Sequence, residues 1–374
     1  MSTKPLFDPS AFRIPAGVTH VCAGGETAPL LRHDAALSRY LADKSRGMPG
    51  RVAQEAAEEA ARAGIARLFG VAPGDIGFVS NVAEGVSIVA ESLDWRDGDN
   101  ICVDANEYPS VVGPFALHRQ PPVQIRIAAG DAPDRLAGLV DARTRLIGVS
   151  YVSYLTGARA DLAALRRLAD SVGALLIVDF TQAAGALPIE ASVADFAFSA
   201  SYKWLLGITG VASAYWNRAR QPGWSPASAG WYSFAPGSRG YDPPPALRPD
   251  AGRFTRGNPA HASLYVLGSA LNYLEGFDMR DVQRHVQGLT VALLDRLDAV
   301  QIPVMTPRDP LHHGASVCVP SPQAQAIVDA LGDRGVLAWN GQGRVRFSFH
   351  GYNGSDDVDR IVTAMRQIWP SWSR

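Results

Sequence analysis

The chain has 374 residues, of which 47% are hydrophobic and 19% are charged, and its formal net charge is −1. These values are typical of a globular protein long enough for two packed domains, and they exclude a disordered chain. The near-zero charge gives no field that would attract nucleic acid or an anionic membrane. No apolar segment has the length of a membrane span, and residues 1–9 lack the features of a signal peptide.

The three cysteines lie far apart in the sequence, at Cys22, Cys102 and Cys318. Cys102 and Cys318 lie inside apolar segments that have the character of strands. Small buried thiols of this kind are typical of proteins from a reducing compartment, so we expect a cytoplasmic protein.

Short apolar segments alternate with amphipathic helical segments from about residue 75 to residue 216. Helical patterns cover 84–93 and 161–172, and Asp161 is a candidate N-cap of the second helix. This alternation predicts an α/β domain with a mainly parallel seven-stranded sheet, which binds ligands beyond the carboxyl ends of its strands. The predicted strands are 77–81, 100–107, 123–129, 145–153, 174–180, 195–200 and 211–216.

The remainder of the chain predicts a long irregular segment followed by a smaller α+β unit. Residues 217–258 are rich in Pro, Gly, Ser and aromatic residues, and such a length without periodicity is usually functional or mobile. A helical region follows, from residue 259 to about residue 300. The smaller unit has predicted strands at 315–319, 335–339 and 344–350 and helices at 322–334 and 355–368. We therefore expect an N-terminal arm (1–20), a large domain (21–258) and a small C-terminal domain with a connecting helix (259–374).

Lysine is rare in this chain, which has only Lys4, Lys44 and Lys203 although Lys and Arg together number 35. Lys203 alone lies in an apolar and aromatic segment, FAFSASYKWLLG. A desolvated lysine loses its proton readily and can form a Schiff base, whereas arginine cannot. The alternative is a lysine whose stem packs in the core while its ammonium reaches solvent.

Polar residues follow two of the predicted strands. Asp179 ends the apolar segment ALLIVDF, where a carboxylate needs a cation or hydrogen-bond donors unless it merely caps the next helix. Gln182 follows three residues later, and Lys203 comes after the next strand. A pyridoxal phosphate (PLP) ring needs a carboxylate at its pyridine nitrogen, a donor at its phenolic oxygen and a lysine at its aldehyde carbon.

The segments VDFTQAAGALPIE and DFAFSASYKWLLGITGV resemble the cofactor region of class V aminotransferase-fold enzymes. This fold type I group includes cysteine desulfurases, kynureninases, isopenicillin N epimerases and serine-type aminotransferases. The resemblance extends from about Thr19 to the C-terminus and implies pyridoxal 5′-phosphate as the cofactor. It places Asp179 at the pyridine nitrogen, Gln182 at the phenolic oxygen and Lys203 in the internal aldimine.

The same resemblance assigns further residues to the cofactor. SNVAEGVSIVA resembles the helix start that holds the phosphate. Val82 and Ala83 stand where relatives often have hydroxyl residues, so the resemblance implies phosphate contacts through their main-chain groups alone. NEYPSVVGPF places Tyr108 on the ring face, unless Tyr108 is only a core aromatic residue. Tyr202 would reach the phosphate, a task that Ser201 would share.

Two more segments imply contacts with a partner subunit and with the substrate. In FTRGNP, Asn258 corresponds to a residue that crosses a dimer interface to the partner's phosphate, which implies a homodimer with shared active sites. In RVRFSFHGYN, Arg346 corresponds to the arginine that binds the substrate carboxylate through two parallel hydrogen bonds. Arg344 points to the same face of the predicted strand and competes for this role, or both arginines lie on a solvated face.

The expected substrate is an amino acid, whose side chain would be recognised by residues 20–30 and 217–258. Cysteine desulfurases need a mobile nucleophilic cysteine shortly before the arginine that binds the substrate carboxylate. The segment VLAWNGQG (336–343) has no cysteine, and Cys318 lies far upstream of Arg346, so persulfide-forming desulfurase activity is not expected. We expect aminotransferase or β-eliminating lyase chemistry with Lys203 as the base. Epimerase or kynureninase-like hydrolase activity is the alternative.

Two other classes of function, a binding module and a nicotinamide dehydrogenase, agree less well with the sequence than a PLP enzyme. A catalytically silent relative that serves as a binding module is disfavoured by the retained Asp179, Gln182, Lys203 and Arg346. A nicotinamide dehydrogenase is disfavoured because the turn SNVAEG lacks the G-x-G-x-x-G pattern. No metal site is expected, since His312 and His313 have no third ligand nearby. Tyr154 stands where many relatives have Asn, so contacts near the phenolic oxygen are expected to differ.

Overall fold

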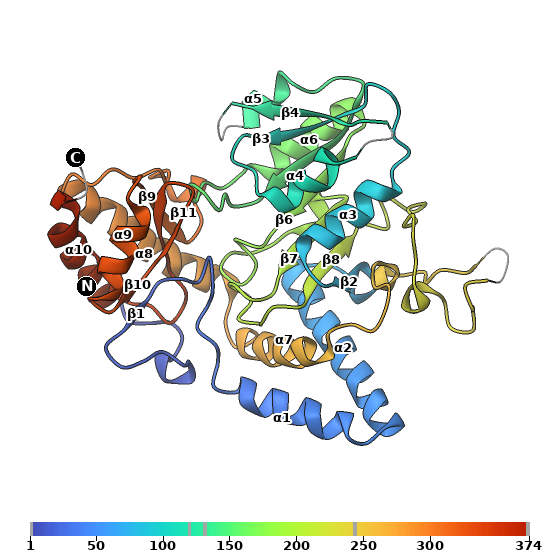
Figure 1. Cartoon of the computed structure of the whole chain (residues 1–374), viewed down its shortest axis with the longest axis horizontal. Helices are drawn as coiled ribbons and strands as arrows, with labels where there is room; N and C mark the ends of the chain where they lie inside the picture. The colour runs from blue at the N-terminus through green and yellow to red at the C-terminus, as the bar shows by residue number, and fades with distance from the viewer. Residues whose placement is uncertain (1–2, 119–120, 130–132, 242–244, 372–374) are drawn as a thin grey trace.

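The computed structural model describes residues 3–118, 121–129, 133–241 and 245–371, and a seven-stranded sheet forms its centre (Figure 1). The strand order is β2-β8-β7-β6-β5-β3-β4. The five strands from β7 to β4 are parallel, and β8 runs antiparallel to both β7 and β2. The strands are β2 (Ile76–Val79), β3 (Asn100–Asp104), β4 (Gln124–Ala128), β5 (Thr144–Ser150), β6 (Leu175–Asp179), β7 (Phe196–Ala200) and β8 (Ala212–Trp216). The predicted mainly parallel sheet is confirmed.

Helices cover both faces of this sheet because residues along each strand alternate between two apolar clusters. In β6, Leu176 and Val178 face one cluster, whereas Ile177 faces the other. Gly85 lets α3 lie close to β7, because a Cβ atom there would come within 2.3 Å of the Phe198 ring. The helices of this part are α3 (Val82–Ser92), α4 (Pro109–Ala116), α5 (Pro133–Ala137) and α6 (Leu162–Val172). The expected helices 84–93 and 161–172 correspond to α3 and α6.

Two helices that the sequence analysis does not predict, α1 (His33–Lys44) and α2 (Met48–Phe69), precede the sheet. They pack against α7 (His261–Leu274), and α1 lies at the outer edge of the molecule (Figure 1). Gly64 in α2 permits this close packing, since a Cβ atom there would lie 2.9 Å from Leu271.

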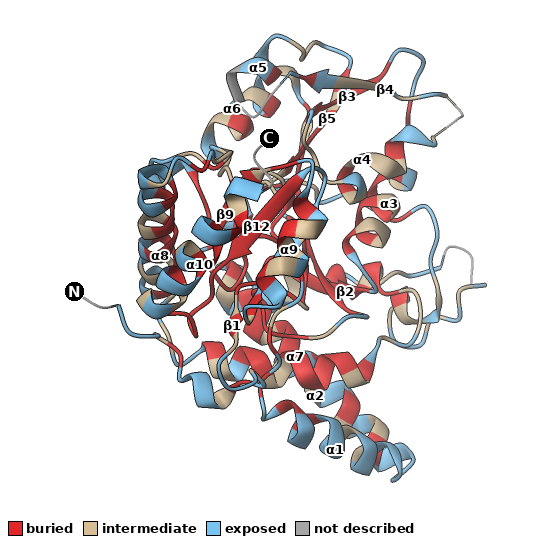
Figure 2. Cartoon of the chain, turned by 60° about the vertical axis from the view of Figure 1, so that its left-hand side comes forward, coloured by how far each residue is buried: buried red, intermediate tan, exposed pale blue. Residues whose placement is uncertain are grey.

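The C-terminal part contains a three-stranded antiparallel sheet in the order β11-β12-β9. Buried residues concentrate in β12 and β9 and on the inner sides of the surrounding helices (Figure 2). The expected strand 335–339 is divided: its first part, β10, pairs with β1 near the N-terminus, and β11 belongs to the three-stranded sheet. The elements are β1 (Thr19–His20), α8 (Met279–Ala299), β9 (Ser316–Pro320), α9 (Ala324–Gly332), β10 (Val336–Leu337), β11 (Trp339–Gly341), β12 (Arg344–Ser348) and α10 (Ser355–Ile368).

Residues 217–241 and 245–258 contain only short 3-10 turns, at Trp231–Ser233 and Ala251–Phe254, and one isolated bridge between Phe234 and Leu247. The expected irregular segment is therefore confirmed over its described residues. The domain boundaries proposed above stay a prediction. No helix among the described residues combines the length and apolar content needed to cross a membrane.

Candidate active site

Two adjoining cavities lie at the carboxyl ends of the parallel strands and share the side chain of Lys203. The first has a volume of about 370 Å³ and is lined by residues that include Asp179 and Val82. The second has a volume of about 270 Å³ and is lined by residues that include Arg346 and Glu26. Both cavities are lined by Tyr108, Tyr154, Gln182, Tyr202 and Lys203. A group bound in the first cavity therefore lies next to a molecule bound in the second.

Asp179 and Lys203 are both buried in the first cavity. Asp179 is the last residue of β6, and its Oδ1 accepts a hydrogen bond of 2.8 Å from the Thr181 amide. Burial raises the pKa of Asp179, while hydrogen bonds from Thr181 and the charge of Lys203 oppose this shift. Burial also lowers the pKa of Lys203 to about 8, and the charge of Arg346 acts in the same direction. Lys203 is thus an amine that gives up its proton more readily than an exposed lysine.

Gln182 lies between the two cavities, and its amide is already held by protein groups. Its Nε2 donates to the Gly24 carbonyl at 2.9 Å, and its Oε1 accepts from the Trp204 indole at 3.2 Å. These bonds fix the orientation of the side chain and leave the second Nε2 hydrogen as the donor available to a ligand.

Two tyrosines, Tyr108 and Tyr202, lie beside the amine of Lys203, and a third, Tyr154, packs against Tyr108. The Lys203 Nζ lies 5.6 Å from the ring centre of Tyr108 and 5.5 Å from that of Tyr202. Tyr108 is the N-cap residue of α4, and the ring of Tyr154 packs edge-on against it, with ring centres 4.9 Å apart. The Tyr154 ring lines both cavities, and the expectation of different contacts near the phenolic oxygen of the cofactor stays a prediction.

Glu107 is a candidate functional residue that the sequence analysis does not identify. Its carboxylate accepts hydrogen bonds of 2.7 Å from the Tyr108 amide and 2.7 Å from the Ser150 amide, and one from the Ser150 hydroxyl. Ser150 pairs with Asp179 in neighbouring strands. Burial raises the pKa of Glu107 to about 7 against these hydrogen bonds. Glu107 thereby links the turn that carries Tyr108 to β5, the strand beside Asp179. The signal for it in the sequence is the acidic residue of NEYP, three residues after the end of β3.

The start of α3 closes another side of the first cavity. Asn81 caps this helix through a 2.9 Å hydrogen bond from the Glu84 amide, and the Ser80 amide donates to the Glu84 carboxylate at 2.6 Å. The amides of Val82 and Ala83 lie in the first turn, where no intrahelical acceptor exists, so they suit an anion. The cavity lining includes Val82 but not Ala83.

Ser201 differs from the expectation that it shares the phosphate with Tyr202. Tyr202 lines both cavities, whereas Ser201 lines neither. The Ser201 hydroxyl lies 2.7 Å from the Ile208 carbonyl and 2.9 Å from the Val211 carbonyl, so it holds the turn after Lys203. The structure does not bring this hydroxyl into the cavity.

Hydrogen bonding separates the two arginines that compete for the substrate carboxylate. Arg344 donates to the carbonyls of Leu155, Gly341 and Tyr154 and so has committed all three of its nitrogens. Arg346 donates from Nη1 to the Tyr154 carbonyl at 2.9 Å, and its buried Nε has no partner among the described residues. Burial lowers the pKa of Arg346 to about 10. The Nε and Nη2 edge of Arg346 is therefore the fork that can bind a carboxylate.

Asn258 lies outside both cavities and is exposed. Its Oδ1 accepts a 2.6 Å hydrogen bond from Arg51 on α2, and the Arg51 guanidinium lies 5.8 Å from the ring centre of Trp231. The structure therefore does not bring Asn258 to the cofactor cavity of its own chain.

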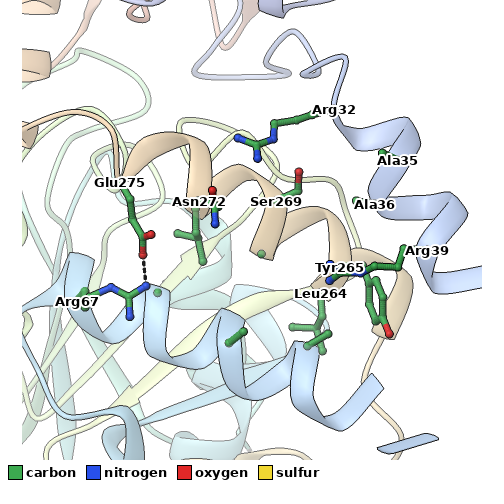
Figure 3. A pocket seen from close by; sticks show the side chains of 15 residues that line it. Arg32, Ala35, Ala36, Arg39, Arg67, Leu264, Tyr265, Ser269, Asn272 and Glu275 are labelled. Carbon is green, nitrogen blue, oxygen red and sulfur yellow. Dashed lines mark hydrogen bonds and ion pairs between the residues drawn. The ribbon is translucent and has the colours of Figure 1, made fainter. Parts of the chain in front are cut away.

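A larger groove, of about 500 Å³, lies between α1, α2 and α7 (Figure 3). Small residues such as Ala36, Gly64 and Gly268 line much of it, and Arg67 forms an ion pair with Glu275 across it. No residue with an assigned cofactor or substrate role lines this groove, so it is separate from the site around Lys203.

The cysteines and the histidine pair add no reactive cluster to the described residues. All three cysteines are free and buried, and burial raises the pKa of Cys22 to about 12. His312 lies on the surface, whereas the Nδ1 of His313 is buried against the Gly314 carbonyl at 2.8 Å. No group of three His, Cys, Asp or Glu that could hold a metal occurs in the described part of the chain.

The first cavity fits PLP by the chemistry of its walls. A buried carboxylate suits a protonated pyridine nitrogen, an amine with a lowered pKa suits an aldehyde, and a helix start suits a phosphate. Gly24 keeps the adjoining cavity open, because a Cβ atom there would lie 2.7 Å from Ser348 Oγ and 3.2 Å from the Arg346 guanidinium carbon.

Residues 30–361 match the model of the aminotransferase class-V family, so the chain belongs to this family. It is similar to a probable cysteine desulfurase of Methanothermobacter thermautotrophicus (28% identity; 82% of each chain) and to a kynureninase of Pseudomonas fluorescens (30% identity; 64% of this chain, 57% of the relative). The fold is similar to an apo cysteine desulfurase from Thermococcus onnurineus (TM-score 0.86; 21% identity; 96% and 97% of the chains). It is also similar to a C-DES mutant with glycine linked to PLP (TM-score 0.87; 22% identity; 97% and 100%).

The protein is therefore a PLP-dependent enzyme with the fold type I architecture, and its cofactor is pyridoxal 5′-phosphate. The expected family, fold and cofactor are confirmed, and the silent binding module is set aside. Cysteine desulfurases are among the relatives and the structural neighbours, which does not favour the expectation that desulfurase activity is absent. Membership of the family leaves the reaction open.

Proposed function

We propose that the enzyme binds an amino acid and carries out transamination or β-elimination. The observation that carries the proposal is the arrangement of Lys203 between a cavity with a buried carboxylate and a cavity with a free arginine fork. Asp179 would hold the pyridine nitrogen, Tyr108 would cover the ring, and Gln182 would donate to the phenolic oxygen. The α3 amides of Val82 and Ala83, together with Tyr202, would hold the phosphate.

Bound PLP supplies an electron sink for the charge that develops at the substrate α-carbon. Arg346 would orient the substrate by its carboxylate, so that the α-carbon hydrogen points toward Lys203. Lys203 Nζ would carry the cofactor in the resting enzyme and move the α-proton during turnover, a task suited to an amine with a pKa of about 8. Glu107 would keep the turn of Tyr108 fixed against the strand beside Asp179.

Persulfide transfer is disfavoured by the surroundings of the three cysteines. Residues 336–343 contain no cysteine, and Cys318 lies in β9, directly opposite Arg346 of β12. Burial raises the pKa of both Cys318 and Cys22, which opposes formation of the nucleophilic thiolate.

A screen of amino acids against the holoenzyme tests the reaction. Transamination predicts a keto acid that requires an amino-group acceptor, and β-elimination predicts a keto acid together with free ammonia. Lys203→Ala is the control that should abolish both products. The proposal is overturned if cysteine yields a protein persulfide that disappears in a Cys318→Ser or Cys22→Ser variant. Racemised amino acid or cleavage of kynurenine would favour the epimerase or hydrolase alternative.

We also propose a homodimer that completes its active sites across the interface. Asn258 is exposed beside Arg51, and the neighbouring surface of α1 and α2 carries exposed Leu41 (63%), Met48 (74%) and Val52 (61%). Such apolar exposure is typical of a surface that a partner covers.

The free thiols and the absence of a disulfide pattern support a cytoplasmic location.

A complementation experiment tests the shared site. Mixing Lys203→Ala with Asn258→Asp subunits, each inactive or impaired alone, would restore one intact site in each mixed dimer and so recover part of the activity. Sedimentation that reports only monomers, or no recovery after confirmed subunit exchange, contradicts the proposal.

A further inference from the structure

The cavity that contains Arg346 has an acidic residue with no assigned role, Glu26. Glu26 ends a short turn that is fixed by hydrogen bonds from the amides of Gly25 and Glu26 to the Cys22 carbonyl, at 2.8 and 2.9 Å. Trp339 packs on this turn, since a Cβ atom on Gly25 would lie 2.5 Å from its indole ring. The turn and the indole together hold Glu26 at the wall of the 270 Å³ cavity.

Glu26 is solvent-exposed although it lines this cavity, and its carboxylate forms no hydrogen bond or ion pair with any residue in the described ranges. Burial raises its pKa, and the charge of Lys203 lowers it. A carboxylate that lines a ligand cavity and has no protein partner is free to pair with a cationic group of a ligand.

The cations that line this cavity are engaged elsewhere. Arg344 donates to three backbone carbonyls. In the proposed function, Arg346 binds the substrate carboxylate and Lys203 carries the cofactor. Glu26 is then left as an unmatched negative charge, next to the polar side chains of Asn340 and Gln342 and the aromatic ring of Trp339.

We propose that Glu26 is a specificity-determining residue that selects amino acids whose side chain carries a positive charge and rejects those with an acidic side chain. The proposal rests on the proposed function, because it needs the substrate carboxylate on Arg346 so that the side chain extends along the remaining walls. A cation there would meet a carboxylate and an aromatic face, and both attract it. An acidic side chain would meet a like charge at the same wall.

Titration of the holoenzyme with amino acids, followed by the absorbance of bound PLP, tests this proposal. Two matched pairs separate charge from shape: arginine against citrulline and lysine against norleucine. We expect wild type to bind at least one cation about two- to fivefold more tightly than its neutral partner, as an exposed ion pair provides. Glu26→Gln should remove this ratio, and Glu26→Lys should reverse the discrimination between glutamate and glutamine. Glu190→Gln, at an exposed glutamate outside both cavities, is the control.

The outcomes separate this proposal from the proposed function. If no amino acid changes the PLP absorbance of wild type, the proposed function fails. If amino acids bind but Glu26→Gln leaves the charge preference unchanged, or wild type prefers the neutral partner in both pairs, the specificity proposal fails and the proposed function stands. An equal loss of turnover for all amino acids with unchanged binding ratios would assign Glu26 to proton transfer and overturn the specificity role.

Discussion

The different hydrogen bonding of Arg344 and Arg346 predicts that substitution of one affects substrate binding and substitution of the other affects stability. Arg346 has an unpartnered Nε beside Nη2, whereas Arg344 donates to three backbone carbonyls. Substitution of each by lysine keeps the charge and removes the planar fork. We therefore expect Arg346→Lys to weaken substrate binding and Arg344→Lys to lower the free energy of unfolding.

The expected magnitude for Arg346→Lys follows from the number of hydrogen bonds lost. A hydrogen bond to a charged group contributes about 1.5–3 kcal/mol. Lysine can retain one of the two bonds to a carboxylate, so the loss is about 2 kcal/mol, which corresponds to about a 30-fold higher Kd. Arg346→Gln also removes the charge, and its Kd should rise by a further factor of about ten.

Two assays on the same variants decide the matter. Amino-acid titration followed by the absorbance of bound PLP gives the Kd, and chemical denaturation gives the free energy of unfolding. Arg344→Lys removes the Nε donor from the part-buried carbonyl of Leu155 and one of the two donors from the carbonyl of Tyr154, which should destabilise the fold by about 2 kcal/mol with little change in Kd. The reasoning is refuted if Arg344→Lys weakens binding as much as Arg346→Lys, or if Arg346→Lys leaves the Kd unchanged.

Glu107 and Gly24 give two further predictions. Because the pKa of Glu107 is raised to about 7 from 4.5, its contribution to stability is present below pH 4.5 and is lost as the pH rises through 7. Wild type should therefore lose about 1–3 kcal/mol relative to Glu107→Gln between these pH values, and parallel pH profiles of unfolding would contradict this. Gly24→Ala should raise the KM for amino acids, because its Cβ would come within 3.0 Å of Gln182 Oε1 and 3.2 Å of the Arg346 guanidinium carbon. An unchanged KM in this variant would show that the turn can move aside.

The sheet was predictable because its strands are short apolar segments with clear ends. ALLIVDF, for example, becomes β6 with Asp179 as its last residue. The helix α2 was missed because the buried face is polar or small until its last turns, where Ile65 and Phe69 lie. The buried residues before them include Gln54, Glu58, Ala61, Arg62 and Gly64. The pattern of apolar periodicity is therefore weak, although the segment is rich in residues that favour helices.

The site was less predictable than the fold, because hydrogen bonds between distant residues decide it. The sequence cannot show that Arg344 is committed to the carbonyls of Tyr154 and Leu155, nearly two hundred residues away along the chain. It also cannot show that the Ser201 hydroxyl is held by Ile208 and Val211. Glu107 acts through Ser150, which belongs to another strand. The contacts of Arg344 and Glu107 join segments that only the folded chain brings together, and the contact of Ser201 depends on the conformation of the turn after Lys203.

The central claim is that Lys203 carries the cofactor, and the scarcity of lysine makes it directly testable. The holoenzyme is reduced with borohydride and digested, and the peptides are analysed by mass spectrometry. The mass of reduced PLP should appear on the peptide that contains Lys203, and Lys203→Ala should show none. Attachment at Lys4 or Lys44, the only other lysines, or the absence of any modified peptide from a coloured holoenzyme, would contradict the account.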